Sequence, residues 1–151
     1  MIILRRLLLA AGLVLALAGP LHAQRGPVAA ALLQFEEAVT WEAVSPEWRR
    51  IRPGWVQQLA NTGSWQQVGG LMVQLEANMG WQAVQGSWRR RRDGWLAEAA
   101  AARGPADNAR LLLKLEAVTL WSAVNSSWRQ ARPGWVQQLS QAAGGGGSPT
   151  K

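Results

Sequence analysis

The sequence predicts an all-α protein built from three tandem copies of an αα-hairpin repeat of about 40 residues. The first observation is the stretch WEAVSPEWRRIRPGW, which begins at Trp41 and returns as related stretches at Trp81 and Trp121. The second is that each stretch follows a segment rich in Ala, Leu, Gln and Glu, residue types that occur readily in helices. A fixed period of this length is typical of stacked units that are each too small to bury an apolar face alone.

Nine positions hold one residue type in all three copies, at a spacing of 40 residues without slippage. In the first copy they are Glu36, Trp41, Ala43, Val44, Trp48, Arg49, Arg52, Gly54 and Trp55. Nine of the ten tryptophans belong to this pattern, in a chain that has no tyrosine and a single phenylalanine. The aromatic residues are therefore tied to the repeat.

The N-terminal residues 1–23 predict a secretory signal peptide. Two early arginines precede an uncharged, largely apolar run over residues 7–19, and the small residue Ala23 follows. The run is short for a helix that must cross about 30 Å of hydrocarbon, so we expect cleavage after Ala23 and a periplasmic or secreted protein. Because the chain has no cysteine, we expect neither a lipid anchor nor a disulfide.

The remaining chain divides into a repeat domain and a tail. We expect one helical domain over residues 24–143, with repeats at about 31–70, 71–110 and 111–143. The glycine-rich residues 144–151 predict a flexible tail.

The first helix of each repeat has a recognisable start. Glycine followed by proline or serine precedes each one, at Gly26-Pro27, Gly63-Ser64 and Gly104-Pro105. We expect these helices to run to about Val44, Val84 and Val124.

The second helix of each repeat is shorter and interrupted. Ser45 and Asn125 are good N-caps, and Pro46 suits the first position of a following helix. Pro53 and its third-copy equivalent are expected to kink or split this helix, because proline removes a backbone donor, and Asp93-Gly94 can cap a new helix in the middle copy. The sequence thus predicts six main helices.

A helical wheel places one invariant acid, Glu36, in the middle of the apolar arc of the first helix. A second wheel places Arg52 on the apolar face of the second helix, between Trp48 and Trp55. An unpaired buried carboxylate costs on the order of several kcal/mol, so the acid needs a cation or must be protonated. We therefore predict largely buried pairs within each repeat, with each arginine packed on the tryptophan four positions before it. The pairs are Glu36 with Arg52, Glu76 with Arg92, and Glu116 with Arg132.

Most tryptophans are expected to form the core, because each buries roughly 150 to 250 Å². The other interpretation is that some are stacking platforms for sugar rings or bases, with nearby arginines holding anionic groups. Trp65 lies outside the repeat pattern and is the best single candidate for an exposed ring.

The charge pattern suggests where an anion would bind. The chain carries a net charge of +7, and loss of residues 1–23, with two arginines and no acid, leaves +5. Arg50, Arg90 and Arg91 point outward and are the candidate contacts for an anionic ligand, which would favour the first two repeats. The plainer interpretation is a solvated helix face.

Little enzymatic chemistry is available to the predicted mature chain. The one histidine, His22, lies in the predicted signal peptide, and cysteine and tyrosine are absent. We expect no catalytic residues, no metal and no cofactor. The one carboxylate alternative, convergence of the three invariant glutamates on a threefold axis, is disfavoured because a catalytic site needs residues with different roles.

Two hypotheses follow for function. The first is a non-catalytic exported interaction or scaffold protein that binds another macromolecule, most simply an envelope or secreted protein, and no small-molecule substrate. The second is a binder of an anionic polymer or surface, such as a glycan, nucleic acid or lipid headgroups. The pattern leaves open whether the repeats form an open arc or a closed ring.

Overall fold

A computed structural model of the chain describes residues 26–144 and is all-helical over that range. Between residues 26 and 144 there are six α-helices, and each repeat also contains one short 3₁₀ turn. The predicted signal peptide and nearly all of the predicted tail lie outside the described residues. None of the described helices is long and apolar enough to span a bilayer.

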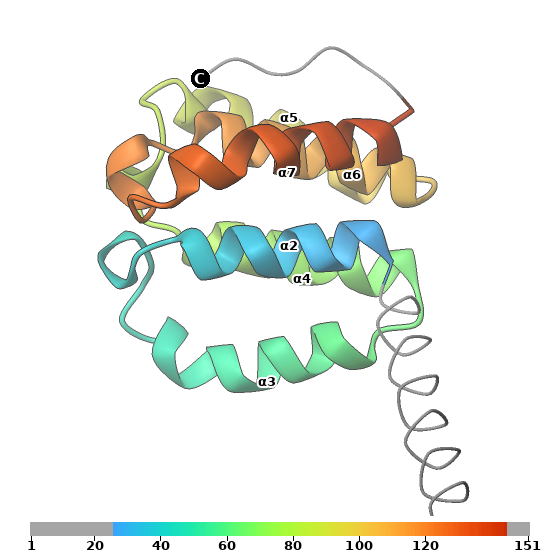
Figure 1. Ribbon diagram of the computed structural model, residues 1–151, viewed down its shortest axis with the longest axis horizontal. Coiled ribbons are helices and arrows are strands. Elements are labelled where there is room, and N and C mark those ends of the chain that lie inside the picture. Colours follow the sequence, from blue (N-terminus) through green and yellow to red (C-terminus); the bar gives the residue numbers. More distant parts are fainter. Residues whose placement is uncertain (1–25, 145–151) are drawn as a thin grey trace, which may run out of the picture.

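Each repeat consists of a first helix, a 3₁₀ turn and a second helix (Figure 1). In order they are α2 (Pro27–Ala38), η1 (Trp41–Ala43) and α3 (Trp48–Asn61); α4 (Trp65–Asn78), η2 (Trp81–Ala83) and α5 (Trp88–Ala100); α6 (Pro105–Val118), η3 (Trp121–Ala123) and α7 (Trp128–Ala142).

The first helices begin where the sequence predicts. Pro27 and Pro105 occupy the first helical position, where a missing backbone donor costs nothing. Ser64 caps α4 by accepting a hydrogen bond from the backbone N–H of Gln67 at 3.2 Å.

The first helices end about six residues earlier than predicted. α2 stops at Ala38, and Val39 has extended backbone angles instead of continuing toward Val44. The reason is tertiary, because the chain leaves the helix to pair its backbone with a neighbouring repeat. Single antiparallel bridges join Val44 to Met79, Val84 to Thr119, and Val39 to Val124.

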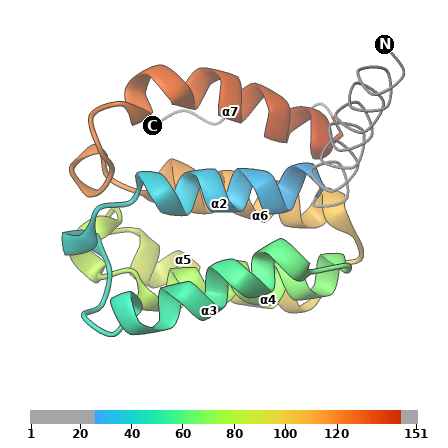
Figure 2. The same ribbon diagram turned by 60° about the horizontal axis from the view of Figure 1, so that its bottom comes forward.

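The last of these bridges closes the three repeats into a ring. It joins the first repeat to the third, and the backbone N–H of Thr40 donates to the carbonyl of Ala123 at 2.9 Å. Equivalent bonds run from Gly80 to Ala43 at 2.9 Å and from Leu120 to Ala83 at 2.8 Å. The ring is therefore pseudo-threefold, which answers the question that the sequence leaves open. All three turns lie at one end of the molecule, on the left in Figures 1 and 2.

The centre of this end is occupied by three alanines. Ala43, Ala83 and Ala123 pack together and are almost completely buried. They are equivalent residues of the three repeats, so they meet around the pseudo-threefold axis. A larger side chain here would meet its two counterparts, which accounts for alanine in every copy.

Indole groups join the repeats along the helices. Trp55 donates its Nε1–H to the carbonyl of Leu71 at 2.9 Å, and Trp95 donates to Leu111 at 3.0 Å. Trp135 of the last helix donates to Ala31 of the first at 2.9 Å, so this contact also closes the ring.

The second helices are continuous, so the predicted split is wrong. α3 and α7 run through Pro53 and Pro133 without a break, and α5 runs through Asp93 and Gly94. In α3 the buried rings of Trp48 and Trp55 pack edge to face on either side of the proline, with centroids 5.4 Å apart. This packing stabilises both halves of the helix and outweighs one lost backbone hydrogen bond.

The predicted N-caps of these helices are also displaced. α3 begins at Trp48 after a turn, with Glu47 as the capping residue and no side-chain cap. Ser45 instead faces the second repeat: its hydroxyl donates to Asn78 Oδ1 at 2.8 Å, and its backbone N–H donates to the Asn78 carbonyl at 2.7 Å. α7 likewise begins at Trp128, three residues after Asn125.

Candidate binding face at the turn end of the ring

A buried carboxylate forms the base of each repeat at the turn end. Arg52 donates from Nε to Glu36 Oε1 at 2.6 Å and from Nη2 to Oε2 at 3.0 Å, which is a bidentate contact. Trp48 donates its Nε1–H to the same carboxylate at 3.1 Å. The buried acid is thus held by a cation and an indole from the second helix of its own repeat.

The other two repeats reproduce this triad. Arg92 Nε lies 2.8 Å from Glu76 Oε1, and Trp88 Nε1 lies 3.1 Å from Glu76 Oε2. In the third repeat, Arg132 Nε and Trp128 Nε1 each lie 2.9 Å from the Glu116 carboxylate. The structure therefore brings together all three glutamate–arginine pairs that the sequence analysis named, and adds an indole donor that it did not.

Two details of the predicted pairs need correction. The glutamates are buried, but the side chains of Arg52 and Arg92 remain 29% and 30% exposed, so these arginines reach the surface. Stacking of Arg52 on Trp48 was also expected. In the structure the Trp48 indole donates to the acid and packs edge to face with Trp55. The hydrogen bond to Glu36 raises the pKa of Arg52, which keeps this cation charged.

The three glutamates do not form a shared acidic site. Each carboxylate is engaged within its own repeat by its own arginine. Over residues 26–144, no group of three or more metal-ligating side chains lies close enough to hold an ion. The ring therefore does not bring the three glutamates together into a site on the threefold axis, which is the carboxylate alternative raised by the sequence.

The exposed rings of the molecule are the tryptophans of the turns. Trp41 is 44% exposed and Trp81 is 47% exposed, whereas the six tryptophans of α3, α5 and α7 are 1–3% exposed. A guanidinium covers part of each exposed ring: Arg49 Cζ lies 4.4 Å from the Trp41 centroid, and Arg89 Cζ lies 4.7 Å from the Trp81 centroid. These are cation–π contacts between two residues that are invariant in the repeat.

The third copy of this arrangement is more closed. Trp121 is half-buried, and it has Arg129 Cζ at 4.4 Å and Arg132 Cζ at 6.0 Å from its ring centroid. We call the surface formed by Trp41, Trp81, Trp121 and their arginine partners the turn face.

A small cavity opens beside each exposed tryptophan. In the first repeat it measures about 280 Å³ and is lined by Trp41, Trp48 and Arg52, among others. In the second repeat the equivalent cavity measures about 260 Å³ and has Trp81 and Arg92 in the same places. The invariant residues therefore build the same shape twice.

The charges around the two cavities differ. Glu37, Glu42 and Glu47 of the first repeat correspond to Ala77, Gln82 and Ser87 of the second. Between positions 36 and 55 the first repeat carries four glutamates and three arginines, whereas positions 76–95 carry two acids and four arginines. The turn face is thus acidic at one repeat and basic at the next.

Of the three arginines predicted to contact an anion, one lies beside a carboxylate and two do not. Arg50 is exposed and lies 3.9 Å from Glu47, so a carboxylate already accompanies it. Arg90 and Arg91 are exposed on α5 beside Arg89, and none of the three forms an ion pair with another described residue. Trp88 lines the second cavity, and Arg91 Cζ lies 5.8 Å from the centroid of its ring.

Trp65 is not part of this surface, and its predicted exposure is wrong. It is half-buried at the start of α4, and its carbonyl accepts a hydrogen bond from Asn108 at 2.6 Å. α4 has 14 residues and is therefore about 20 Å long, which puts Trp65 at the other end of the molecule from Trp81.

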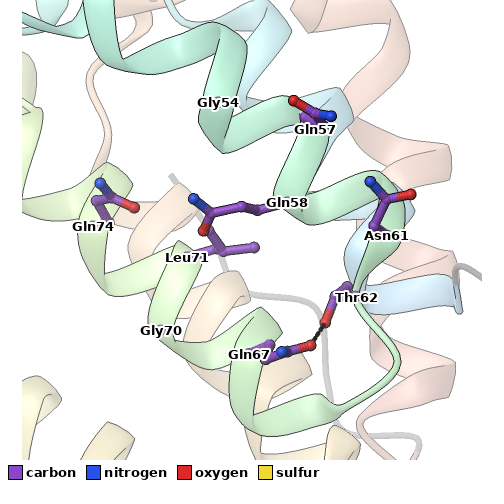
Figure 3. A pocket seen from close by; sticks show the side chains of 9 residues that line it. All are labelled: Gly54, Gln57, Gln58, Asn61, Thr62, Gln67, Gly70, Leu71 and Gln74. Carbon is purple, nitrogen blue, oxygen red and sulfur yellow. Dashed lines mark hydrogen bonds between the residues drawn. The ribbon is translucent and has the colours of Figure 1, made fainter.

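A larger and more open groove lies between α3 and α4 (Figure 3). It measures about 600 Å³ and is lined mainly by amides, including Gln57, Gln58 and Gln74. Thr62 donates to Gln67 at 2.7 Å within it. Leu71 is its main apolar element, and the groove contains neither an aromatic ring nor a charged group, so we regard the turn face as the stronger site.

The chain matches no family model, no curated protein and no solved structure. The functional interpretation therefore depends on the geometry and chemistry of the turn face.

Proposed function

We propose that this protein is an exported, non-catalytic interaction protein that binds another macromolecule, an envelope or secreted protein, through the turn face. The observation that carries the proposal is the contrast in tryptophan exposure. Six indoles are removed from water almost completely, whereas Trp41 and Trp81 remain 44% and 47% exposed at equivalent positions.

The cost of exposing these rings supports a binding role. A partly exposed indole forgoes much of the free energy that its burial would supply, and a ring of this size is an unusual surface residue. Tryptophan and arginine are the residue types most enriched at the energetic centres of protein interfaces. Closure of the ring fixes the turns, so less conformational entropy is lost when a partner binds.

The chemistry of the described residues supports the non-catalytic part of the proposal. The invariant carboxylates are already engaged by arginine and indole donors. His22, the single histidine of the chain, lies outside the described residues. The repeats offer three similar triads, whereas an active site gives different residues different roles.

Binding to an anionic polymer or surface is the second candidate. The run of arginines from Arg89 to Arg92 beside an exposed indole favours it. Such binding would be dominated by charge, so its affinity would fall steeply with salt.

Capture of partners by the purified protein tests the proposal. The protein and its Trp41→Ala/Trp81→Ala variant are immobilised and exposed to the envelope fraction of the source cells. We expect a protein partner that the native chain retains and the double variant loses. A Gln57→Ala/Gln58→Ala variant in the amide groove is the control and should retain the partner.

Retention of every partner by the tryptophan variant would contradict the proposal. Tryptophan emission addresses the second candidate, because added polyanion should shift the emission of Trp41 and Trp81 if these rings bind it. A response to polyanion, together with no captured protein, would favour the second candidate over the first.

A further inference from the structure

The cavities of the first two repeats share most of their lining residue types and differ mainly in charge. Both have an exposed tryptophan, a buried tryptophan, an aliphatic side and a half-buried arginine. Glu37 lines the first cavity, whereas Ala77 lines the second. The chain therefore contains two sites of one shape and opposite electrostatic character.

The walls of the second cavity suit an apolar side chain. Met79 and Val84 form one part of the lining, and the rings of Trp81 and Trp88 form another. At about 260 Å³ the cavity lies below the range of about 300 to 1,000 Å³ that is usual for drug-sized ligands. It is therefore of a size to accept one side chain.

Hydroxyl-rich ligands fit this cavity less well. Glu76 is the one carboxylate in the lining, and its oxygens already accept from Arg92 and from the indole of Trp88. Little acceptor capacity is left for sugar hydroxyls, which need partners when buried.

The rim of the second cavity is cationic. Arg89 lies over the Trp81 ring and Arg91 over the Trp88 ring, so two guanidinium groups without a carboxylate partner among the described residues lie on the tryptophans that line the cavity. Arg90 is exposed between them in the sequence. Guanidinium groups on aromatic rings retain their donors for bidentate contacts with carboxylates.

We propose that the second repeat is the docking site for an acidic protein segment. One apolar side chain of the segment enters the cavity between Trp81 and Trp88, and flanking carboxylates pair with Arg89 and Arg91. This inference rests on the proposed function, because it names the chemistry of the partner that the turn face binds.

The same observations disfavour the other anionic partners. A flat anionic surface that covered the ring end would meet the acidic first repeat as well as the basic second one, and Glu42 and Glu47 are exposed. A polyanion without apolar side chains would leave the cavity empty. An acidic segment with an apolar anchor uses both features and touches one repeat.

Fluorescence anisotropy with a defined probe tests the inference. The probe is a labelled synthetic peptide of ten residues that contains aspartate, glutamate and one central leucine; a matched peptide has serine in place of the leucine. We expect one peptide per chain, and an affinity about tenfold lower for the serine peptide. Trp81→Ala and Arg89→Gln/Arg91→Gln should each weaken binding by about tenfold or more.

The first repeat supplies the matched control. Trp41→Ala removes the equivalent ring and should change peptide affinity by less than about twofold. Ala77→Glu with Gln82→Glu and Ser87→Glu gives the second repeat the three extra glutamates of the first and should abolish binding while Trp81 is retained. The reverse change, Glu37→Ala with Glu42→Gln and Glu47→Ser, should add a second, weaker site. Thermal melts of each variant establish that it is folded.

Several outcomes would overturn the inference. Equal binding of the leucine and serine peptides would show that the cavity is not used, and equal effects of Trp41→Ala and Trp81→Ala would show that the rim charge does not select the repeat. If heparin, a single-stranded oligonucleotide or anionic vesicles bind through Trp81 and the peptide does not, the acidic segment is wrong. In that case the turn face would remain a binding surface, but for a different partner. The capture experiment with the double tryptophan variant tests the proposed function separately.

Discussion

The interior triads and the turn face are built from the same residue types but differ in how far the repeats preserve them. In the interior, glutamate, arginine and tryptophan meet at nearly the same distances in all three copies. At the surface, Trp41 and Trp81 are exposed, Trp121 is half-buried, and the neighbouring charges change from repeat to repeat. The triads hold each repeat together, whereas the turn face keeps its tryptophans and varies in the charges around them, which set what each repeat can bind.

The largest expected effect comes from breaking one interior triad. Arg92→Met leaves the buried Glu76 with the Trp88 indole as its remaining donor among the contacts described, so we expect a loss of about 3 to 5 kcal/mol in the free energy of unfolding. Glu76→Leu/Arg92→Met should cost less than Arg92→Met alone, because it removes both charges. It still leaves the Trp88 N–H unsatisfied, at about 1 to 3 kcal/mol. Urea unfolding measures both, and additive losses without coupling would contradict the buried pair.

A smaller effect is expected where an indole joins two repeats. Trp135→Phe keeps an aromatic ring but removes the donor to the Ala31 carbonyl, which should cost about 1 to 3 kcal/mol. Trp55→Phe removes the equivalent bond between the first two repeats and serves as the comparison. The two losses should be similar in a closed ring. A negligible loss at Trp135 alone would indicate that the first and third repeats do not pair in solution.

At the turn face, stability and binding should separate. Trp81→Ala removes a ring that is about half exposed, and we expect a loss in stability of about 1 kcal/mol or less. The same substitution should weaken partner binding much more, because a partner would cover the solvent-facing part of the Trp81 ring. Thermal melts and capture assays on one preparation test this, and a large loss of stability would place Trp81 with the interior residues.

The smallest effect concerns a residue that belongs to neither region. The backbone N–H of Arg103 and the side chain of Arg110 lower the pKa of Asp107 at the start of α6. A carboxyl group whose pKa is lowered by folding stabilises the protein above its unfolded pKa of about 3.9, and this contribution is lost as pH falls through the folded value. Asp107→Asn should therefore reduce stability slightly at neutral pH and by less at pH 2. Unfolding at both pH values, in low and high salt, measures it.

Residues inside regular helices could be predicted from the sequence. Glu36 and Arg52 each lie on a helix of known period, so two independent wheels place them in the interior and pair them. The helix starts at Pro27 and Ser64 follow from local capping chemistry. These features depend on a few neighbouring residues, which is the information that a single sequence carries best.

Features that depend on distant repeats could not be predicted. We expect the first helix to continue to Val44, whereas Val44 has left the helix and pairs with Met79 of the second repeat. The β-branched pair Val39-Thr40 and Gly80, at the position equivalent to Thr40, disfavour helix at these positions and were the available signals. The disruptive effect of Pro53 on α3 was overestimated, because burial of Trp48 and Trp55 and the bond from Trp55 to Leu71 of the second repeat hold the helix on both sides of the proline.

Ring closure also makes the order of the repeats along the chain dispensable. α2 and α7 pack together, and Trp135 of α7 donates to the carbonyl of Ala31 in α2 at 2.9 Å, so the first and last described helices are neighbours. The three residues 62–64 suffice to connect α3 to α4. A circular permutant that joins Gly144 to Gly26 through a short linker and opens the chain at Gly63 should therefore fold to the same ring, with new termini at an exposed loop.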